Sequence, residues 1–498
     1  MFGPETDFET NVTLEADKTG VIDEPPFHIL VLGDWSGDAG KNDLHRRKPL
    51  EIDRDNFDDT MKKLRVGLDI EAGELVLEFQ GIDDFHPDEL FRQVPIFAEL
   101  RGLRQRLLNA DTFNSASREV REWFPVQQKT DAADSVKQES DDLPAENLLD
   151  AILSKPGGGA APPSSRSTHS SELNSLLSEI VRPHLVSVDE NEQTSLVAAV
   201  DSATSSLMRS ILHHRKFQKL EAAWRGLYFL VRRAETASDL KIFILDISKS
   251  ELSEHLKTTA NLTDSIVYEV MAADNQDDPW SAVFGNYAFE PNVDDIAALI
   301  RIGKLAAAAG APFISHMRPE VLGISSLAVQ PDPADWKISD DSSEAKLWAA
   351  LRDQPEAKYL GMTIPRFLVR PPYGCETDPL ETFSFEEFAD EPPHGGYVWA
   401  NSCFAAAVLL AESYSEYGWE MGRTLKQDIE GLPTHTYTHN GETIFKSSAE
   451  VQLSQNASER LSEAGLMPLV SFKNTDRVRL LRFQSISDPV TPLLGRWN

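Results

Sequence analysis

Apolar positions in the first quarter of the chain follow the spacing of strands and helices in turn. The stretch "FHILVLGDWSG", residues 27–37, reads as an apolar strand over Ile29 to Leu32 that runs into a tight turn. "ELVLEF" alternates apolar and charged residues, which predicts a half-buried strand. "DDFHPDELFRQVPIFAELRGLRQRLL" predicts a helical segment that breaks or kinks at Pro95. The pattern predicts an α/β unit over residues 25–125, after a polar and disordered N-terminus at residues 1–24.

The next stretch, residues 126–172, loses this periodicity. "QQKTDAADSVKQESDD" and "KPGGGAAPPSSRSTHSS" have the composition of flexible linkers. Between them, residues 146–155 predict a short amphipathic helix with one apolar face, made of Leu148, Leu149, Ile152 and Leu153. This helix either packs back on a neighbouring domain or serves as a docking peptide for a groove in a partner.

A second and larger unit is predicted over residues 173–498. "FQKLEAAWRGLYFLVRRAE" repeats apolar residues at helical spacing, and "LKIFILDIS" follows as a fully buried strand. The predicted fold class is therefore α/β (or α+β), with two units of mixed sheets flanked by helices and joined by a flexible linker.

The net charge and the cysteine content of the chain argue against several classes of protein. The net charge of −32 argues against binding to nucleic acid or to anionic lipid. Two cysteines, Cys375 and Cys403, do not make a disulfide framework, and the sequence shows no signal peptide. No apolar run reaches the roughly 18 residues that span a membrane. We therefore expect a cytoplasmic protein with no direct membrane insertion.

The turn after the first strand is the first candidate for chemistry. A nucleophile elbow needs G-x-S-x-G followed by a helix, but in "GDWSG" Ser36 stands one place too late and a basic loop follows. A phosphate-binding loop fails as well, because Asn42 stands where a Ser or Thr should follow Gly40-Lys41. His435 and His439 of "HTYTH" share one face of a strand but lack a third ligand. We expect no catalytic, cofactor or metal site, and a serine hydrolase using Ser36 stays as the weakest alternative.

Six motifs resemble, in the same order, the large subunit of the type VI secretion contractile sheath (the TssC or VipB family). They are "FQKLEAAWRGLYFLV", "GNYAFE", "AAAAGAPFI", "WAALRDQPEAKYLGMTIPRFLVRPPYG", "GYVWANSCFAAAVL" and "IEGLPTHTY", within residues 175–476. Three further motifs, within residues 25–108, resemble the small sheath subunit (the TssB or VipA family). They are "PFHILVLGDWSG", "RRKPLEIDRDNFDDTMKKL" and "LEFQGIDDFHPDELFRQVPIFAELRGLR".

The resemblance implies a structural protein and not an enzyme. Its expected function is a component of a bacterial contractile sheath that assembles around an inner tube and drives its ejection on contraction. The implied partners are sheath subunits (self or co-encoded), the inner tube protein, the baseplate and a ClpV-type AAA+ unfoldase that docks on the helix Leu148 to Leu153. The alternative is an accessory or adaptor protein of the same machine that binds sheath subunits without forming the tube.

The resemblance also marks candidate assembly residues. These are Glu221, Trp224, Arg225, Arg352, Arg366 and Arg370. For each of them an intramolecular ion pair or core contact is the competing interpretation. The resembling large subunits continue past the "KNTD" region, whereas this sequence ends at Asn498. The C-terminally short second unit leads us to expect that a partner chain completes the sheet between neighbouring copies.

Overall fold

The computed structural model describes residues 25–41, 43–70, 75–122, 192–273, 278–337 and 341–498. The predicted N-terminal segment 1–24 and the whole predicted linker at residues 126–172, with the predicted docking helix at 146–155, lie outside the described residues.

A mixed sheet forms the centre of the molecule, and within the described residues it has nine strands in the order β11-β15-β14-β8-β7-β6-β1-β5-β2. Its strands are β1 (Phe27–Gly33), β2 (Leu50–Ile52), β5 (Leu240–Asp246), β6 (Trp280–Phe289), β7 (Phe313–Met317), β8 (Leu360–Ile364), β11 (Asp428–Ile429), β14 (Leu466–Ser471) and β15 (Val478–Leu480). The six central strands from β14 to β5 run parallel, and the outer strands β2, β15 and β11 pair antiparallel with their neighbours. The predicted α/β class with a mixed sheet is confirmed.

Strand β1 lies inside this sheet between β5 and β6. Its register with β5 is continuous, from Phe27 opposite Leu240 to Gly33 opposite Asp246. On its other edge, His28 to Leu32 pair in parallel with β6. A strand that is covered on both faces and paired on both edges needs a continuous apolar run, which explains the sequence FHILVLG. Strands from the two predicted units therefore share one sheet.

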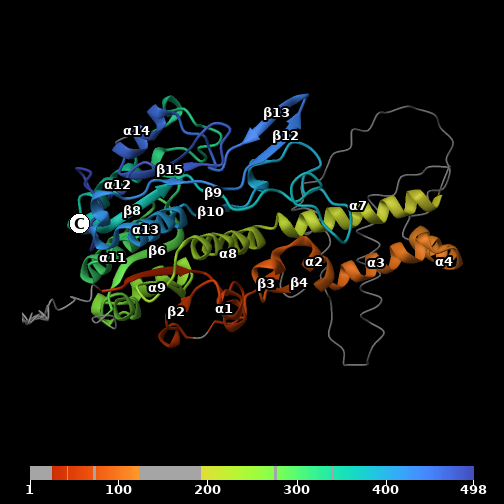
Figure 1. The fold of residues 1–498 in the computed structure, drawn as a ribbon, viewed down its shortest axis with the longest axis horizontal. Helices are drawn as coiled ribbons and strands as arrows, with labels where there is room; N and C mark the ends of the chain where they lie inside the picture. Colours follow the sequence, from red (N-terminus) through yellow and green to blue (C-terminus); the bar gives the residue numbers. More distant parts are fainter. Residues whose placement is uncertain (1–24, 42, 71–74, 123–191, 274–277, 338–340) are drawn as a thin grey trace, which may run out of the picture.

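Helices cover both faces of the sheet (Figure 1). The helices of the described residues are α1 (Phe57–Leu64), α2 (Pro87–Gln93), α3 (Pro95–Leu108), α4 (Ala110–Glu122), α7 (Glu192–Leu212), α8 (Arg215–Arg233), α9 (Lys249–Thr258), α10 (Ile266–Tyr268), α11 (Val293–Ala309), α12 (Ser343–Arg352), α13 (Cys403–Tyr417) and α14 (Gln455–Glu463). Alternate residues of β1 divide between two cores: Ile29 and Val31 pack with α8 and α13, and Leu30 and Leu32 pack with α9 and α11. The result is a three-layer α/β/α arrangement.

Three two-stranded sheets complete the strands of the described residues. They are β3 (Gly67–Ile70) with β4 (Leu75–Glu78), β9 (Phe367–Leu368) with β10 (Trp399–Ala400), and β12 (His435–His439) with β13 (Glu442–Lys446). The β12–β13 hairpin stands out from the body in Figure 1.

A helical arm extends to one side of the sheet, where α7 runs alongside α3 and α4 (Figure 1). Leu100, Leu103 and Leu107 of α3 recur at helical spacing and are buried in the same core as Ala199 and Val200 of α7. As predicted, Pro95 interrupts the helical segment: α2 ends at Gln93 and α3 begins at Pro95. The arm joins the last helix before residue 123 to the first helix after residue 191.

Candidate functional site

The candidate site consists of the contacts between residues 25–122 and residues 192–498, and we call this set of contacts the seam. At its centre the turn after β1 is held by Asp246, which ends β5. One carboxylate oxygen of Asp246 accepts hydrogen bonds from the backbone N–H groups of Trp35 (2.8 Å) and Ser36 (3.2 Å). The other accepts from Ser36 Oγ at 2.7 Å. The hydroxyl of Ser36 therefore donates to a carboxylate inside a buried turn, which is the geometry of a structural serine.

Aromatic rings pack directly behind this turn. The indole Nε1 of Trp224, on α8, donates to the backbone carbonyl of Trp35 at 2.9 Å. The two indole rings meet edge to face with centroids 5.5 Å apart, and Phe57 of α1 meets Trp224 at 5.5 Å. Such pairs add to the stabilisation from their buried area. Trp224 thus joins the two halves of the seam.

Several charged side chains surround the outer side of the turn. Lys41 forms ion pairs with Asp34 and with Glu251, the latter at 3.5 Å. Arg47 donates to Glu251 at 2.7 Å and to the backbone carbonyl of Asp246 at 2.8 Å. Burial opposes ionisation of Glu251, but hydrogen bonds from Arg47 and Ser248 outweigh it and lower its pKa to about 2. Glu251 therefore stays ionised and fixes the basic loop that follows β1.

The seam continues at α2, where Asp88 holds a loop of residues 192–498. Its carboxylate accepts from the backbone N–H groups of Glu381 and Thr382, both at 3.0 Å, and from the Thr382 hydroxyl. Burial would raise the pKa of Asp88, but these hydrogen bonds outweigh it and lower the pKa. In the arm, Arg104 forms a bidentate pair with Asp201.

A buried ionic network connects α8 to the loop after β9. Arg370 donates to Glu221 at 2.7 Å and to Glu387 at 2.7 Å, and Arg225 donates to Glu221 at 2.7 Å. Glu221 and Glu387 are 0% and 1% exposed, and Arg370 is 6% exposed. Burial alone would raise the pKa of Glu387, but Arg370 and His213 lower it to about 2. All the charges of this network are compensated inside the molecule.

The structure brings only some of the predicted assembly residues together. Glu221, Arg225 and Arg370 share the buried network, whereas Trp224 contacts Trp35 and Phe57 at the seam. Two predicted arginines lie elsewhere: Arg366 pairs with Glu450 at 2.6 Å, and Arg352 donates to the backbone carbonyl of Ile486 at 2.8 Å. Each of the three predicted arginines 352, 366 and 370 has a partner within the chain. The predicted docking residues Leu148, Leu149, Ile152 and Leu153 lie outside the described residues.

Sequence reasoning missed three carboxylates that organise these contacts: Asp88, Asp246 and Glu387. The sequence did contain a feature that could have identified Asp246, because this residue directly follows the apolar run LKIFIL and lies beside the end of β1. Asp88 and Glu387 had none, since acidic residues are abundant in this chain and their partners lie far away in the sequence.

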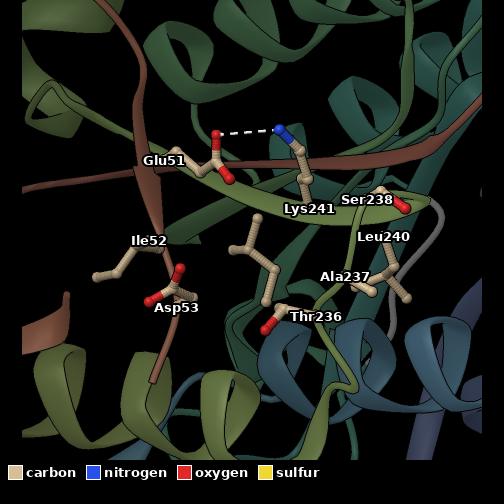
Figure 2. Close-up of a pocket in the computed structure, with 9 residues that line it drawn as sticks. Glu51, Ile52, Asp53, Thr236, Ala237, Ser238, Leu240 and Lys241 are labelled. Carbon is tan, nitrogen blue, oxygen red and sulfur yellow. Dashed lines mark hydrogen bonds and ion pairs between the residues drawn. The ribbon is translucent and has the colours of Figure 1, made fainter. Parts of the chain in front are cut away.

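The predicted histidine pair, His435 and His439, gathers no third potential metal ligand within the described residues. His435 Nδ1 lies 2.9 Å from the Tyr397 hydroxyl, and within the described residues no group of three potential ligands could hold a metal ion. A hollow of about 310 Å³ lies at the edge of the sheet, where Glu51 of β2 and Lys241 of β5 form an ion pair at 3.4 Å (Figure 2). No helix in the described part of the chain combines the length and apolar character needed to cross a membrane.

Comparison with known families identifies the two sides of the seam. The family model VipB, described as "EvpB/VC_A0108, tail sheath N-terminal domain", matches residues 194–487, which is more than half of the chain. The family model T6SS_VipA, described as "Type VI secretion system, VipA, VC_A0107 or Hcp2", matches residues 10–139. The chain therefore belongs to the VipB family of tail sheath proteins and carries a VipA-type segment ahead of the VipB region, as the sequence motifs predicted.

Among curated relatives, the chain is similar to the type VI secretion system sheath protein TssC1 of Pseudomonas aeruginosa (strain PAO1). The two are 37% identical over 305 residues, which cover 59% of this chain and 61% of the relative. The chain thus matches less than two thirds of the length of that relative. These matches support a sheath component of the type VI secretion system.

Proposed function

We propose that this chain supplies the VipA-type and the VipB-type parts of a sheath protomer in one polypeptide, which assembles with further sheath chains into a contractile tube around an inner tube protein and drives its ejection. One observation carries the proposal. Strand β1 of the VipA-type segment lies between β5 and β6 of the VipB-type segment and pairs with both.

This strand order makes the two segments inseparable parts of one fold. Without β1, β5 and β6 would each lose one of their two neighbouring strands in the middle of the sheet, and the apolar side chains of both cores would lose contacts. Fusion fixes the ratio of the segments at one to one and gives them an effective concentration of the order of millimolar. A chain that carries both parts can enter a repeating assembly as one unit.

Assembly itself requires contacts between different surfaces of neighbouring copies, because such contacts propagate into open helical tubes. The proposed partners are therefore further sheath chains, the inner tube protein and the baseplate.

The test is to express the chain alone, with its co-encoded sheath subunits, and with the inner tube protein, followed by sedimentation and negative-stain microscopy. The proposal predicts sedimenting tubes of regular diameter that contain this chain. Discrete complexes with sheath subunits and no tube would instead support the alternative of an adaptor. Ser36→Ala tests the hydrolase alternative: an esterase activity of the pure protein that this substitution abolishes while the fold stays intact would support a hydrolase, and we expect no such activity.

We further propose that residues 146–155 dock a ClpV-type unfoldase that recycles the contracted sheath. Burial of three or four Leu and Ile side chains gives several kcal/mol before the cost of ordering the segment, so micromolar affinity is expected. Calorimetry with a peptide of residues 144–156 and the N-terminal domain of the unfoldase tests this. A peptide with Leu149 and Ile152 changed to Ser is the control, and absence of heat from the unchanged peptide at high micromolar concentration contradicts the proposal.

A further inference from the structure

The last residue of β13, Lys446, lies in surroundings that are unusual for a lysine. Its Nζ is 3.3 Å from Nδ1 of His394 and lies over the rings of Tyr397 and Trp399, 5.3 and 5.5 Å from their centroids. Among the residues that the structure describes, no carboxylate forms an ion pair with this ammonium. Burial disfavours the charged form more than the nearby Glu450 favours it, so the pKa of Lys446 is lowered. A desolvated lysine of this kind is a better nucleophile at neutral pH than an exposed one.

The imidazole of His394 is oriented to take a proton from this lysine. An ammonium can only donate, so Nδ1 of His394 is its acceptor, and the proton of the neutral ring lies on Nε2. That Nε2 donates to Oε1 of Glu450 at 3.1 Å. Glu450 is held in turn by Arg366, which donates to it from Nε at 3.0 Å and from Nη2 at 2.6 Å. Carboxylate, imidazole and amine thus follow the order in which nucleophilic sites place the orienting group, the base and the nucleophile.

A hollow of about 450 Å³ lies beside this group of side chains. Lys446 and Glu450 line it, together with Lys473 and Asn474 from the loop after β14. Lys473 is exposed and forms no ion pair with any residue that the structure describes. An ammonium without a counter-ion attracts an anionic molecule from solution. The hollow therefore combines a nucleophile with a positive charge that suits an anionic electrophile.

We propose that Lys446 is an acylation site that reacts with acyl phosphates. His394 Nδ1 takes a proton from the ammonium of Lys446, and Glu450 stabilises the resulting imidazolium. The free amine attacks the acyl carbon, so that a C–N bond forms, the C–O bond to phosphate breaks, and phosphate leaves with the electron pair. Lys473 attracts the phosphate group of the donor. The products are a neutral amide on Lys446, inorganic phosphate and one proton released to water.

Acylation changes what holds the β12–β13 hairpin to the body. Lys446 is paired across the hairpin with His435, whose Nδ1 lies 2.9 Å from the Tyr397 hydroxyl. A neutral amide loses the attraction of an ammonium for the faces of Tyr397 and Trp399. It also loses the charged hydrogen bond to His394. We therefore expect faster amide hydrogen exchange in residues 435–446 of the acylated chain.

Acetyl phosphate is the probe for this site. The full chain is incubated with it at neutral pH, and peptide mass spectrometry gives the rate of acetylation at each lysine. We expect Lys446 to react several-fold faster than Lys63, which is exposed on α1. In guanidinium chloride the two lysines should react alike, because the advantage comes from the fold. Labelling of Lys446 no faster than that of Lys63 in the native chain, or an advantage that persists in denaturant, would overturn the inference.

Three variants separate the roles of the neighbouring side chains. His394→Gln removes the base and should slow acetylation of Lys446 several-fold without changing that of Lys63. His439→Gln, at a hairpin histidine with 38% of its side chain exposed, is the matched control and should change neither rate. Lys473→Gln should slow labelling by acetyl phosphate but not by the uncharged donor N-hydroxysuccinimidyl acetate.

Thermal melting by circular dichroism shows whether each variant is folded. If His394→Gln does not fold, the comparison of Lys446 with Lys63 in the unchanged chain still decides the question. Rates at Lys446 that ignore His394→Gln in a folded variant, or that ignore Lys473→Gln with acetyl phosphate, would overturn the inference.

Discussion

Replacing Arg370 by Met tests the buried network that ties α8 to the loop after β9. The substitution leaves Glu221 and Glu387 in the interior, at 0% and 1% exposure, without the guanidinium that joins them. Breaking a buried pair by removal of one partner costs about 3–5 kcal/mol. Arg225 still contacts Glu221, and His213 lies 3.4 Å from Glu387, so we expect the lower end, about 3 kcal/mol.

The assay is urea unfolding of the full chain at pH 7, followed by fluorescence and circular dichroism. Arg104→Met is the matched control, since Arg104 and Asp201 form a pair with both side chains 45% exposed. Exposed pairs are worth about 0–1 kcal/mol, so the control should lose much less. Adding Glu387→Gln to Arg370→Met should restore part of the lost stability, because it removes one uncompensated charge.

The pH dependence gives an independent check. With Arg370 present, the pKa of Glu387 is about 2, so its ionised form stabilises the fold at neutral pH. Without Arg370, we expect burial to raise the pKa of Glu387 above that of an unfolded glutamate. The loss of stability caused by Arg370→Met is then complete at pH 7. This loss of stability becomes smaller as the pH falls through the raised pKa, because the Glu387 carboxyl becomes neutral. A loss of less than about 1 kcal/mol, equal to that of Arg104→Met, would refute the reasoning.

Three further predictions concern the seam. Asp246→Ala removes three hydrogen bonds to the turn and should destabilise the protein more than Ser36→Ala, which removes one and should cost about 1 kcal/mol; equal melting temperatures would contradict this. The pKa of Glu251 is about 2, so its contact with Arg47 stabilises the fold above about pH 4.5 and is lost as the pH falls toward 2. The difference in melting temperature between the natural chain and Arg47→Gln should accordingly shrink over that interval, and a constant difference would oppose it. Cleavage at a protease site inserted within residues 123–191 should leave both fragments co-eluting in native buffer, and their separation without denaturant would show that the seam is weak.

Local pattern predicted the elements of the fold well where one face or both faces are buried. The run FHILVLG predicted a strand because a central parallel strand is apolar throughout, and the periodicity of FQKLEAAWRGLYFLV predicted α8. Pro95 predicted the break between α2 and α3 through its missing N–H. The family resemblance rested on motifs in collinear order, and the family models match the same two regions.

The local sequence pattern could not predict which distant segments of the chain pair with each other. Nothing in residues 25–33 shows that β1 lies between β5 and β6, because the partners are more than 200 residues away and parallel pairing depends on the whole sheet. The same holds for the ionic network: Arg370 was a candidate, but its partner Glu387 was one acidic residue among many. Charge identity alone does not tell an exposed pair from a buried one, which depends on tertiary packing.

The most direct test of the account is an electron cryo-microscopy map of tubes assembled from this chain with the inner tube protein. We predict one chain per repeating unit, with density for β1 continuous with its own chain and placed between β5 and β6 of the same chain. A map in which a separate small subunit supplies the strand between β5 and β6 would contradict the central claim that the VipA-type and VipB-type parts of one polypeptide form one protomer.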